Sequence, residues 1–192
     1  ISLHSHLGWL GKGLIGTKWL ATRKGLGATN HFEAGGFIKS DPELDYPDIQ
    51  FHFLPVAMSY DGKVKASQHG FQVHVGPMLS KSRGAIKLAS SNPKDQPKIQ
   101  FNYMSNEEDF VVFRKAIRTA RSIFQQAPFD GIRGKELNPG SNCQSDDELD
   151  AFVKSNAESA YHPCGTCKMG VDNDSVVDPH ARVKGIDKLR VA

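Results

Sequence analysis

The most informative stretch of the chain is Tyr161-His162-Pro163-Cys164-Gly165-Thr166-Cys167-Lys168-Met169-Gly170. Its mixture of a titratable ring, two thiols, two glycines and a proline is too irregular for a buried strand or an amphipathic helix. Pro163 fixes one backbone angle and offers no N–H to a neighbouring strand, while Gly165 and Gly170 permit sharp turns. The stretch therefore predicts a loop that carries chemistry, and the rest of the fold is interpreted around it.

Three segments that follow this loop complete a recognisable pattern: Val176-Val177-Asp178-Pro179, Arg182-Val183 with Gly185, and Leu189-Arg190-Val191. Together with the loop they resemble the C-terminal signature of the glucose–methanol–choline (GMC) oxidoreductases, and in particular their bacterial choline-oxidising branch. The supporting stretches are residues 30–37, 50–55, 69–76 and 101–105. The resemblance covers nearly the whole chain from Asn30 onward, and the first thirty residues match only loosely.

The resemblance implies that residues 1–192 are the substrate-binding, C-terminal part of a larger FAD-dependent oxidoreductase, without its Rossmann-like FAD domain. Residues 161–192 would then hold the active-site loop and the start of the return into the FAD domain. Two features of the sequence itself also predict a piece of a longer protein. The first residue is Ile1, and residues 189–192 look like a strand that stops in its middle. We expect such a piece to bind no FAD tightly and to have no turnover.

Composition excludes several classes of protein. The length suits one domain or one and a half, and a formal net charge of +3 with interspersed signs gives no argument for nucleic acid. No apolar run approaches the roughly 18 residues of a membrane helix. Three cysteines, an odd number, argue against a secreted disulfide framework. The sequence favours a reducing, cytoplasmic location, with peripheral attachment of the parent to the inner membrane as an alternative.

The first half of the chain predicts β-strands, because apolar residues alternate with polar ones from about Phe32 to Ala89. Asp61-Gly62 and Arg83-Gly84 are typical of turns between antiparallel strands, and residues 98–103 read as one more strand. The alternating apolar positions are Phe51, Phe53 and Pro55, then Phe71, Val73 and Val75, then Ile86 and Leu88.

The second half predicts helices. Ser105-x-x-Glu108 has the form of a capping box, and apolar residues then follow at helical spacing up to Pro128. Ser145-x-x-Glu148 repeats the signal for a shorter helix, and residues 129–144 between the two predict an irregular crossing. Strands followed by helices predict an α+β fold, an antiparallel β-sheet packed with helices. We expect the sheet to form one wall of the substrate cavity and the helices to cover its other face.

One motif invites a misleading interpretation. Gly11-Lys12-Gly13-Leu14-Ile15-Gly16 satisfies G-x-G-x-x-G, and Glu33 lies near the spacing of a ribose-binding acid. A dinucleotide fingerprint needs a buried strand directly before it and a helix opening from it. Residues 5–10 contain no β-branched run, so the sequence predicts that these glycines belong to a loose, broken amphipathic helix or a loop. The resemblance agrees, since the flavin fingerprint of the family lies near the N-terminus of the parent.

His162 is the candidate catalytic residue. Oxidising an alcohol removes a hydroxyl proton, and a neutral imidazole with a pKa of about 6.5 is suited to accept that proton or to stabilise the alkoxide. The oxidation also removes a hydride, which no side chain can accept, so a flavin or nicotinamide is required. A histidine that only caps a turn is the alternative. The resemblance favours catalysis, because the histidine of this signature faces the reactive edge of the flavin and works with a partner beyond Ala192.

Cys164-x-x-Cys167 could in principle be a redox pair or half of a zinc site. The sequence offers no second C-x-x-C and no H-x-x-x-H, and no βαβ pattern surrounds the motif. Two small thiols packed beside the active-site loop are the better interpretation. We therefore expect no metal, and Cys143 has no assignable role.

His52 and Glu33 are the candidate substrate-binding residues. The resemblance implies that a histidine on a strand comparable to that of His52 helps bind the substrate, although a histidine satisfied by the backbone is the alternative. Glu33, beside Phe32, could provide the counter-charge to a quaternary ammonium group, which aromatic faces recognise; a solvated acid at a strand end is its alternative. The same argument is weaker for His69 and His74.

The resemblance implies that the parent oxidises choline to betaine aldehyde, a step towards glycine betaine, with FAD as cofactor. Its electrons would pass to an acceptor of the respiratory chain. Two alternatives stay open from the residues alone. One is a GMC oxidoreductase acting on another primary alcohol, and the other is a non-catalytic binding module with this fold.

Overall fold

The computed structural model describes residues 3–6, 8–57 and 69–191, so the predicted turn at Asp61-Gly62 lies outside the described residues. The chain divides into two compact units. Unit 1 comprises Ile1–Lys81 and Asn106–Val153, and unit 2 comprises Ser82–Ser105 and Lys154–Ala192. Strands and helices are both present, which confirms the predicted α+β class, and the two units are described separately below.

The sheet of unit 1 is antiparallel and three-stranded, in the order β1-β2-β3. Its strands are β1 (Ala34–Ile38), β2 (Ile49–Leu54) and β3 (Gln72–Pro77). The period-two pattern therefore predicted β2 and β3 to within two residues at each end. Asp48 stabilises the connection from β1, because its carboxylate accepts hydrogen bonds from the N–H and the hydroxyl of Ser40, at 2.6 and 2.7 Å.

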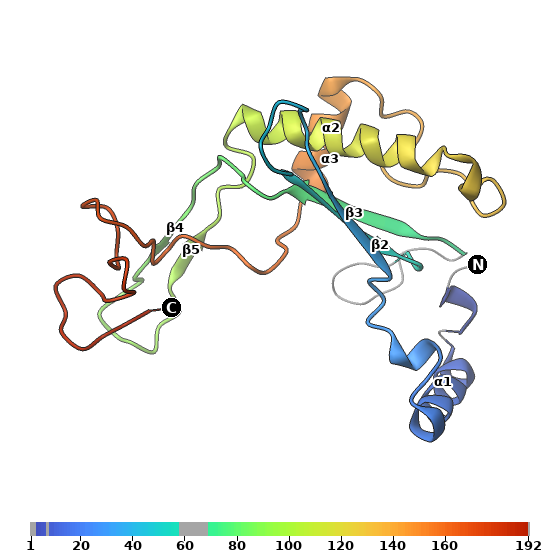
Figure 1. Ribbon diagram of the computed structural model, residues 1–192, viewed down its shortest axis with the longest axis horizontal. Helices are drawn as coiled ribbons and strands as arrows, with labels where there is room; N and C mark the ends of the chain where they lie inside the picture. The colour runs from blue at the N-terminus through green and yellow to red at the C-terminus, as the bar shows by residue number, and fades with distance from the viewer. Residues whose placement is uncertain (1–2, 7, 58–68, 192) are drawn as a thin grey trace. The chain divides into compact units, whose positions relative to one another are not determined.

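One face of this sheet is covered by α2 (Glu107–Phe124), which Figure 1 shows crossing above β2 and β3. Ile49 and Phe51 of β2 pack against Ala116 and Ala120 of α2, and these four form the buried core cluster of unit 1. At the N-terminal end of α2, Asp109, only 2% exposed, accepts hydrogen bonds from the Ser80 hydroxyl and the Lys81 N–H. The expectation of a sheet with helices on one face is confirmed.

The cap of α2 differs from the predicted one. Asn106 is the N-cap, and its side chain accepts a hydrogen bond from the N–H of Glu108 at 2.9 Å. The predicted capping box at Ser105 is therefore wrong by one residue, because an asparagine amide next to the serine satisfies the helix N–H instead. The capping box of α3 (Asp146–Asn156) is confirmed, since Ser145 and Glu148 exchange side chain to backbone hydrogen bonds.

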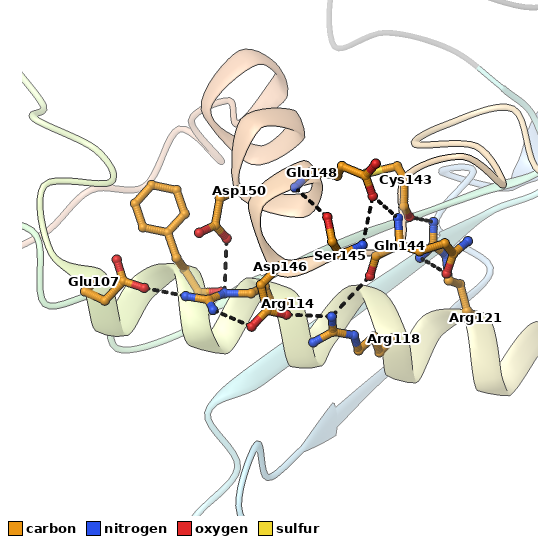
Figure 2. A network of polar contacts seen from close by, with 11 residues as sticks. Glu107, Arg114, Arg118, Arg121, Cys143, Gln144, Ser145, Asp146, Glu148 and Asp150 are labelled. Carbon is orange, nitrogen blue, oxygen red and sulfur yellow. Dashed lines mark hydrogen bonds and ion pairs between the residues drawn. The ribbon is translucent and has the colours of Figure 1, made fainter.

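The crossing between α2 and α3 is irregular, as predicted, and arginines of α2 hold it in place (Figure 2). Arg121 donates to both oxygens of Glu136 and to the carbonyls of Gly140 and Cys143. Arg114 forms ion pairs with three carboxylates, and Arg118 forms one with Asp146. These contacts fix residues 136–146 along one side of α2.

The predicted loose helix near the N-terminus is a 3-10 turn, η1 (Leu3–His6), followed by the continuous helix α1 (Trp9–Thr22). The predicted amphipathic character is not realised, because none of the residues of α1 is buried and Trp9, Leu10 and Leu14 are exposed. α1 runs through Gly11, Gly13 and Gly16 without a break, although the sequence predicted a broken helix.

Unit 2 contains a separate two-stranded antiparallel sheet, β4 (Ala85–Lys87) with β5 (Lys98–Gln100). The sequence predicted these strands but not their separation from the sheet of unit 1, and it extended the last strand three residues too far. The rest of unit 2, up to Val191, is built from turns and isolated β-bridges.

Candidate functional site

The three predicted site residues lie in different units. His52 is on β2 and Glu33 directly precedes β1, both in unit 1, whereas His162 is on a loop of unit 2. The structure thus brings Glu33 and His52 into one region of unit 1, and His162 belongs to unit 2.

His52 lies on the face of the sheet that α2 leaves uncovered. Side chains alternate along a strand, so the contacts of Ile49 and Phe51 with α2 place Gln50 and His52 on the opposite face. His52 is half-buried, which leaves its ring partly accessible. A partly accessible imidazole on an open sheet face can accept or donate a hydrogen bond to a ligand, as the prediction for His52 requires.

Phe32 and Glu33 form the edge of this region. The ring of Phe32 meets the ring of His52 edge-on, with centroids 5.8 Å apart and planes at 80°. The backbone before β1 is held by side chains, because Thr29 Oγ1 accepts from the N–H of His31 and Asn30 Oδ1 accepts from the N–H of Phe32. Glu33 is exposed and accepts a hydrogen bond from the hydroxyl of Thr29. Its link to His52 therefore runs through the neighbouring ring of Phe32.

His162 is fully on the surface of unit 2, in a loop with unusual backbone angles. Tyr161 has φ of 64° and Gly165 has φ of 104°, in the left-handed region that glycine adopts freely and tyrosine does not. The N–H of Tyr161 donates to the Ser159 hydroxyl, which helps hold the turn just before His162. An exposed imidazole at such a turn is available to a substrate.

The loop is anchored on its C-terminal side by the signature segments. The carbonyl of Lys168 accepts from the N–H of Val176, and the N–H of Gly170 donates to the carbonyl of Val177, which is 1% exposed. Asp178 closes the next turn. Hydrogen bonds, first from the backbone N–H of Arg182 and then from its guanidinium and the N–H of His180, lower the pKa of the Asp178 carboxyl to about 2. These hydrogen bonds therefore hold the C-terminal side of the loop in place.

A family profile described as GMC oxidoreductase matches residues 80–192, more than half of the chain. The chain belongs to the GMC oxidoreductase family. The signature segments from Tyr161 to Val191, which include His162 and the Asp178 turn, lie within the matched residues, so the recognition made from them is confirmed.

Named relatives match this GMC chain over its full length. An oxygen-dependent choline dehydrogenase of Brucella canis is 55% identical over 194 residues, covering 100% of this chain and 35% of that protein. The protein of the same name from Rhizobium johnstonii is 57% identical with the same coverage. The chain thus spans about a third of the length of these relatives.

Solved structures with the same fold include two oxidases. Formate oxidase superposes with a TM-score of 0.83 at 24% identity, covering 100% of this chain and 38% of that one, which shows the fold alone. Pyridoxine 4-oxidase from Mesorbium loti has a TM-score of 0.75 at 29% identity, covering 83% of this chain and 32% of that one. Both likenesses support the α+β substrate-domain fold predicted for this GMC chain.

The two cysteines beside His162 are free and exposed, rather than packed beside the loop as expected. Within residues 3–6, 8–57 and 69–191, no three His, Cys, Asp or Glu side chains gather as metal ligands. Over the same residues, no helix has both the length and the apolar character needed to cross a bilayer.

The glycine motif does not fit a dinucleotide. Gly11, Gly13 and Gly16 lie in the interior of α1, whereas a flavin fingerprint needs its glycines in the turn between a strand and a helix. A pyrophosphate is bound by backbone N–H groups, and the N–H of Lys12, inside this motif, already donates to the Gly8 carbonyl at 2.9 Å. This GMC chain therefore offers no cradle for FAD at the only motif that resembled one.

Sequence reasoning missed Gln72 beside His52 and gave His74 only a weaker argument. His74 is the cross-strand partner of His52, and Gln72 Nε2 lies 2.6 Å from His74 Nε2. The alternation along β3 could have placed both on one face, but only the register of β2 with β3 shows that this is the face of His52.

Proposed function

We propose that the chain is the substrate-binding part of a longer FAD-dependent enzyme that oxidises choline to betaine aldehyde, towards glycine betaine. The observation that carries this proposal is the identity of 55 to 57% over the whole chain with proteins named oxygen-dependent choline dehydrogenase. Because the chain spans 35% of those relatives, the activity belongs to the complete protein. The isolated chain is proposed to be inactive.

The open face of the sheet supports a substrate that is cationic or neutral. Its accessible positions on β1, β2 and β3 are Gly35, Phe37, Gln50, His52, Gln72 and His74, none of which carries a fixed charge, whereas Leu54 at the end of β2 is 3% exposed. An anionic substrate would need an arginine or lysine there. A quaternary ammonium group instead favours aromatic faces, and Phe32 and Phe37 are both exposed.

The roles of the three site residues follow from their chemistry. His162 accepts the hydroxyl proton of the substrate, or stabilises the alkoxide by a hydrogen bond. His52 hydrogen-bonds the bound substrate from the sheet, and Glu33 provides a carboxylate for the ammonium group. Of the two Glu33 carboxylate oxygens, Oε1 is occupied by Thr29.

FAD would supply the hydride acceptor that no side chain of this chain can provide. Since the glycines of α1 do not form a dinucleotide cradle, we propose that the remainder of the complete protein holds the cofactor. The electron acceptor and the cytoplasmic location, with peripheral membrane attachment as the alternative, stay predictions. The names of the relatives make dioxygen the first acceptor to test against a respiratory one.

The decisive experiment is anaerobic reduction of the flavin in the full-length protein. Choline and the neutral isostere 3,3-dimethylbutan-1-ol are mixed separately with wild type and with His162→Ala, and the loss of oxidised flavin is followed. We expect choline to reduce the wild-type flavin faster than the isostere, and His162→Ala to be slower by roughly 10² or more. If only the neutral alcohol reduces the flavin, the protein is a GMC oxidoreductase that acts on another alcohol. A full-length protein without flavin would favour the alternative of a binding module.

A further inference from the structure

His52 has an imidazole neighbour on the open face of the sheet. The antiparallel register of β2 and β3 pairs His52 with His74, and the flanking pairs are Phe51 with Val75 and Phe53 with Val73. Residues paired in this way have Cβ atoms roughly 4.5–5.5 Å apart and point to the same face. Because Val73 and Val75 pack towards α2, His74 and His52 both lie on the side away from that helix.

Gln72 orients the ring of His74. The two residues are two positions apart on β3, so they share a face, and Gln72 Nε2 lies 2.6 Å from His74 Nε2. An amide nitrogen only donates, so this contact uses His74 Nε2 as its acceptor. The amide therefore restrains the rotation of the His74 ring.

This arrangement builds more than a single binding histidine. His52, Gln72 and His74 are each half-buried, so they combine partial desolvation with access for a ligand. Phe32 closes the side of His52 with its ring edge. The titratable side chains that flank these strands in the sequence include His31 and Glu33 before β1, Lys39 after it, Asp48 before β2 and His69 before β3.

We propose that His74, held by Gln72, is a second substrate-positioning residue, and that the His52–His74 pair forms a polar wall of the substrate site, against which the hydroxyl end of the alcohol binds. The ligand class is a small alcohol with a quaternary ammonium or equally bulky neutral head group. The inference rests on the proposed function, because it deepens the assignment of this face to the substrate. It assigns His74 to binding and orientation, while proton transfer stays with His162.

The test uses the full-length flavoprotein and four variants. His74→Leu removes the polar ring at similar size, and His74→Gln places an amide near the former Nε2. Gln72→Leu removes the orienting group and leaves the ring. His6→Leu is the matched control, because His6 is an exposed histidine of η1, outside the β1-β2-β3 sheet. Anaerobic stopped-flow reduction with choline gives the apparent Kd and the limiting rate of flavin reduction for each protein.

We expect His74→Leu to raise the apparent Kd for choline about tenfold, because one half-buried polar contact is lost. The limiting rate of flavin reduction should change less than about threefold. Gln72→Leu should raise the Kd by about threefold, and His74→Gln should restore it to within about threefold of wild type. His6→Leu should match wild type. This split between Kd and limiting rate would not arise from a purely structural role.

The contrary results are equally specific. An unchanged Kd in His74→Leu overturns the inference. The inference is also overturned if His74→Leu and His74→Gln both lose bound FAD to the same extent. Failure of the proposed function is separate, since it shows in the wild type as a flavin that choline does not reduce. In that case the same variants are measured with whichever alcohol does reduce the flavin, and an unchanged Kd again overturns the role of His74.

Discussion

Asp178 shows how a single residue stabilises the end of the chain. Its carboxylate accepts hydrogen bonds from the N–H groups of His180 and Arg182, and the Arg182 guanidinium donates to its second oxygen at 2.7 Å. Ala181, inside the turn, has φ of 61°, an uncommon angle for a residue with a side chain. The carboxylate therefore compensates for a strained turn by satisfying the backbone around it.

The pKa of Asp178 gives a prediction at the same scale. Because the folded state lowers this pKa from 3.8 to about 2, the turn is stabilised fully above about pH 4, and the stabilisation is lost as the pH falls from about 4 to about 2. We expect a carbon-13 NMR titration of the Asp178 carboxyl to have its midpoint near 2. Arg182→Ala should raise the midpoint only in part, since the backbone N–H remains. A wild-type midpoint near 3.8 would contradict the described turn.

The start of α2 offers a matched pair of variants at the level of an element. The Asn106 side chain accepts from the N–H of Glu108, whereas Ser105 was the cap predicted from sequence. We expect Asn106→Ala to lower the free energy of unfolding by about 1 kcal/mol and Ser105→Ala to change it by less than about 0.5 kcal/mol. Chemical denaturation of the two variants measures both values, and the reverse order would restore the capping box.

The crossing onto α2 depends on the shape of arginine. The side chain of Arg121 is 16% exposed and bonds Glu136 and two carbonyls at once, a pattern that the single ammonium of lysine cannot reproduce. Arg121→Lys should therefore cost about 1–3 kcal/mol and make residues 130–144 more sensitive to proteolysis. Arg118→Lys is the control, because Arg118 is 48% exposed and its replacement should cost less than about 1 kcal/mol. Equal effects would contradict this account.

What the sequence could predict at this scale follows from local physics. Alternation identified β2 and β3, helical spacing identified α2 and α3, and the Ser145–Glu148 box was found because both partners lie within one turn. The pairing of His52 with His74 could not be predicted, since a strand register depends on contacts between distant segments and a slip of one residue reverses every face. The candidate site was thus only partly predicted: His52 and, with a weaker argument, His74 were named, but their pairing was not.

At the scale of the whole molecule, local patterns did not predict how the strands divide. β4 and β5 are three residues each with all positions exposed, so they carry no buried pattern that would tell a second sheet from an extension of the first. The helix α1 is a similar case. Its apolar residues predicted a buried stripe, yet in this chain they face solvent. Both features belong to a chain that spans about a third of the length of its relatives.

The exposed apolar surface leads to a prediction for the chain as a whole. Trp9, Leu88 and Val171 are each more than 80% exposed, and large apolar side chains are exposed in both units. Large exposed apolar patches in a protein are typical of surfaces that another part covers. We expect the purified 192-residue chain to bind a hydrophobic dye, to self-associate in sedimentation, and to show no flavin absorbance. The full-length protein, as the control, should bind less dye and carry FAD. A monomeric chain that retains flavin would show that the fragment itself holds the cofactor, and the assignment of FAD to the remainder would then be wrong.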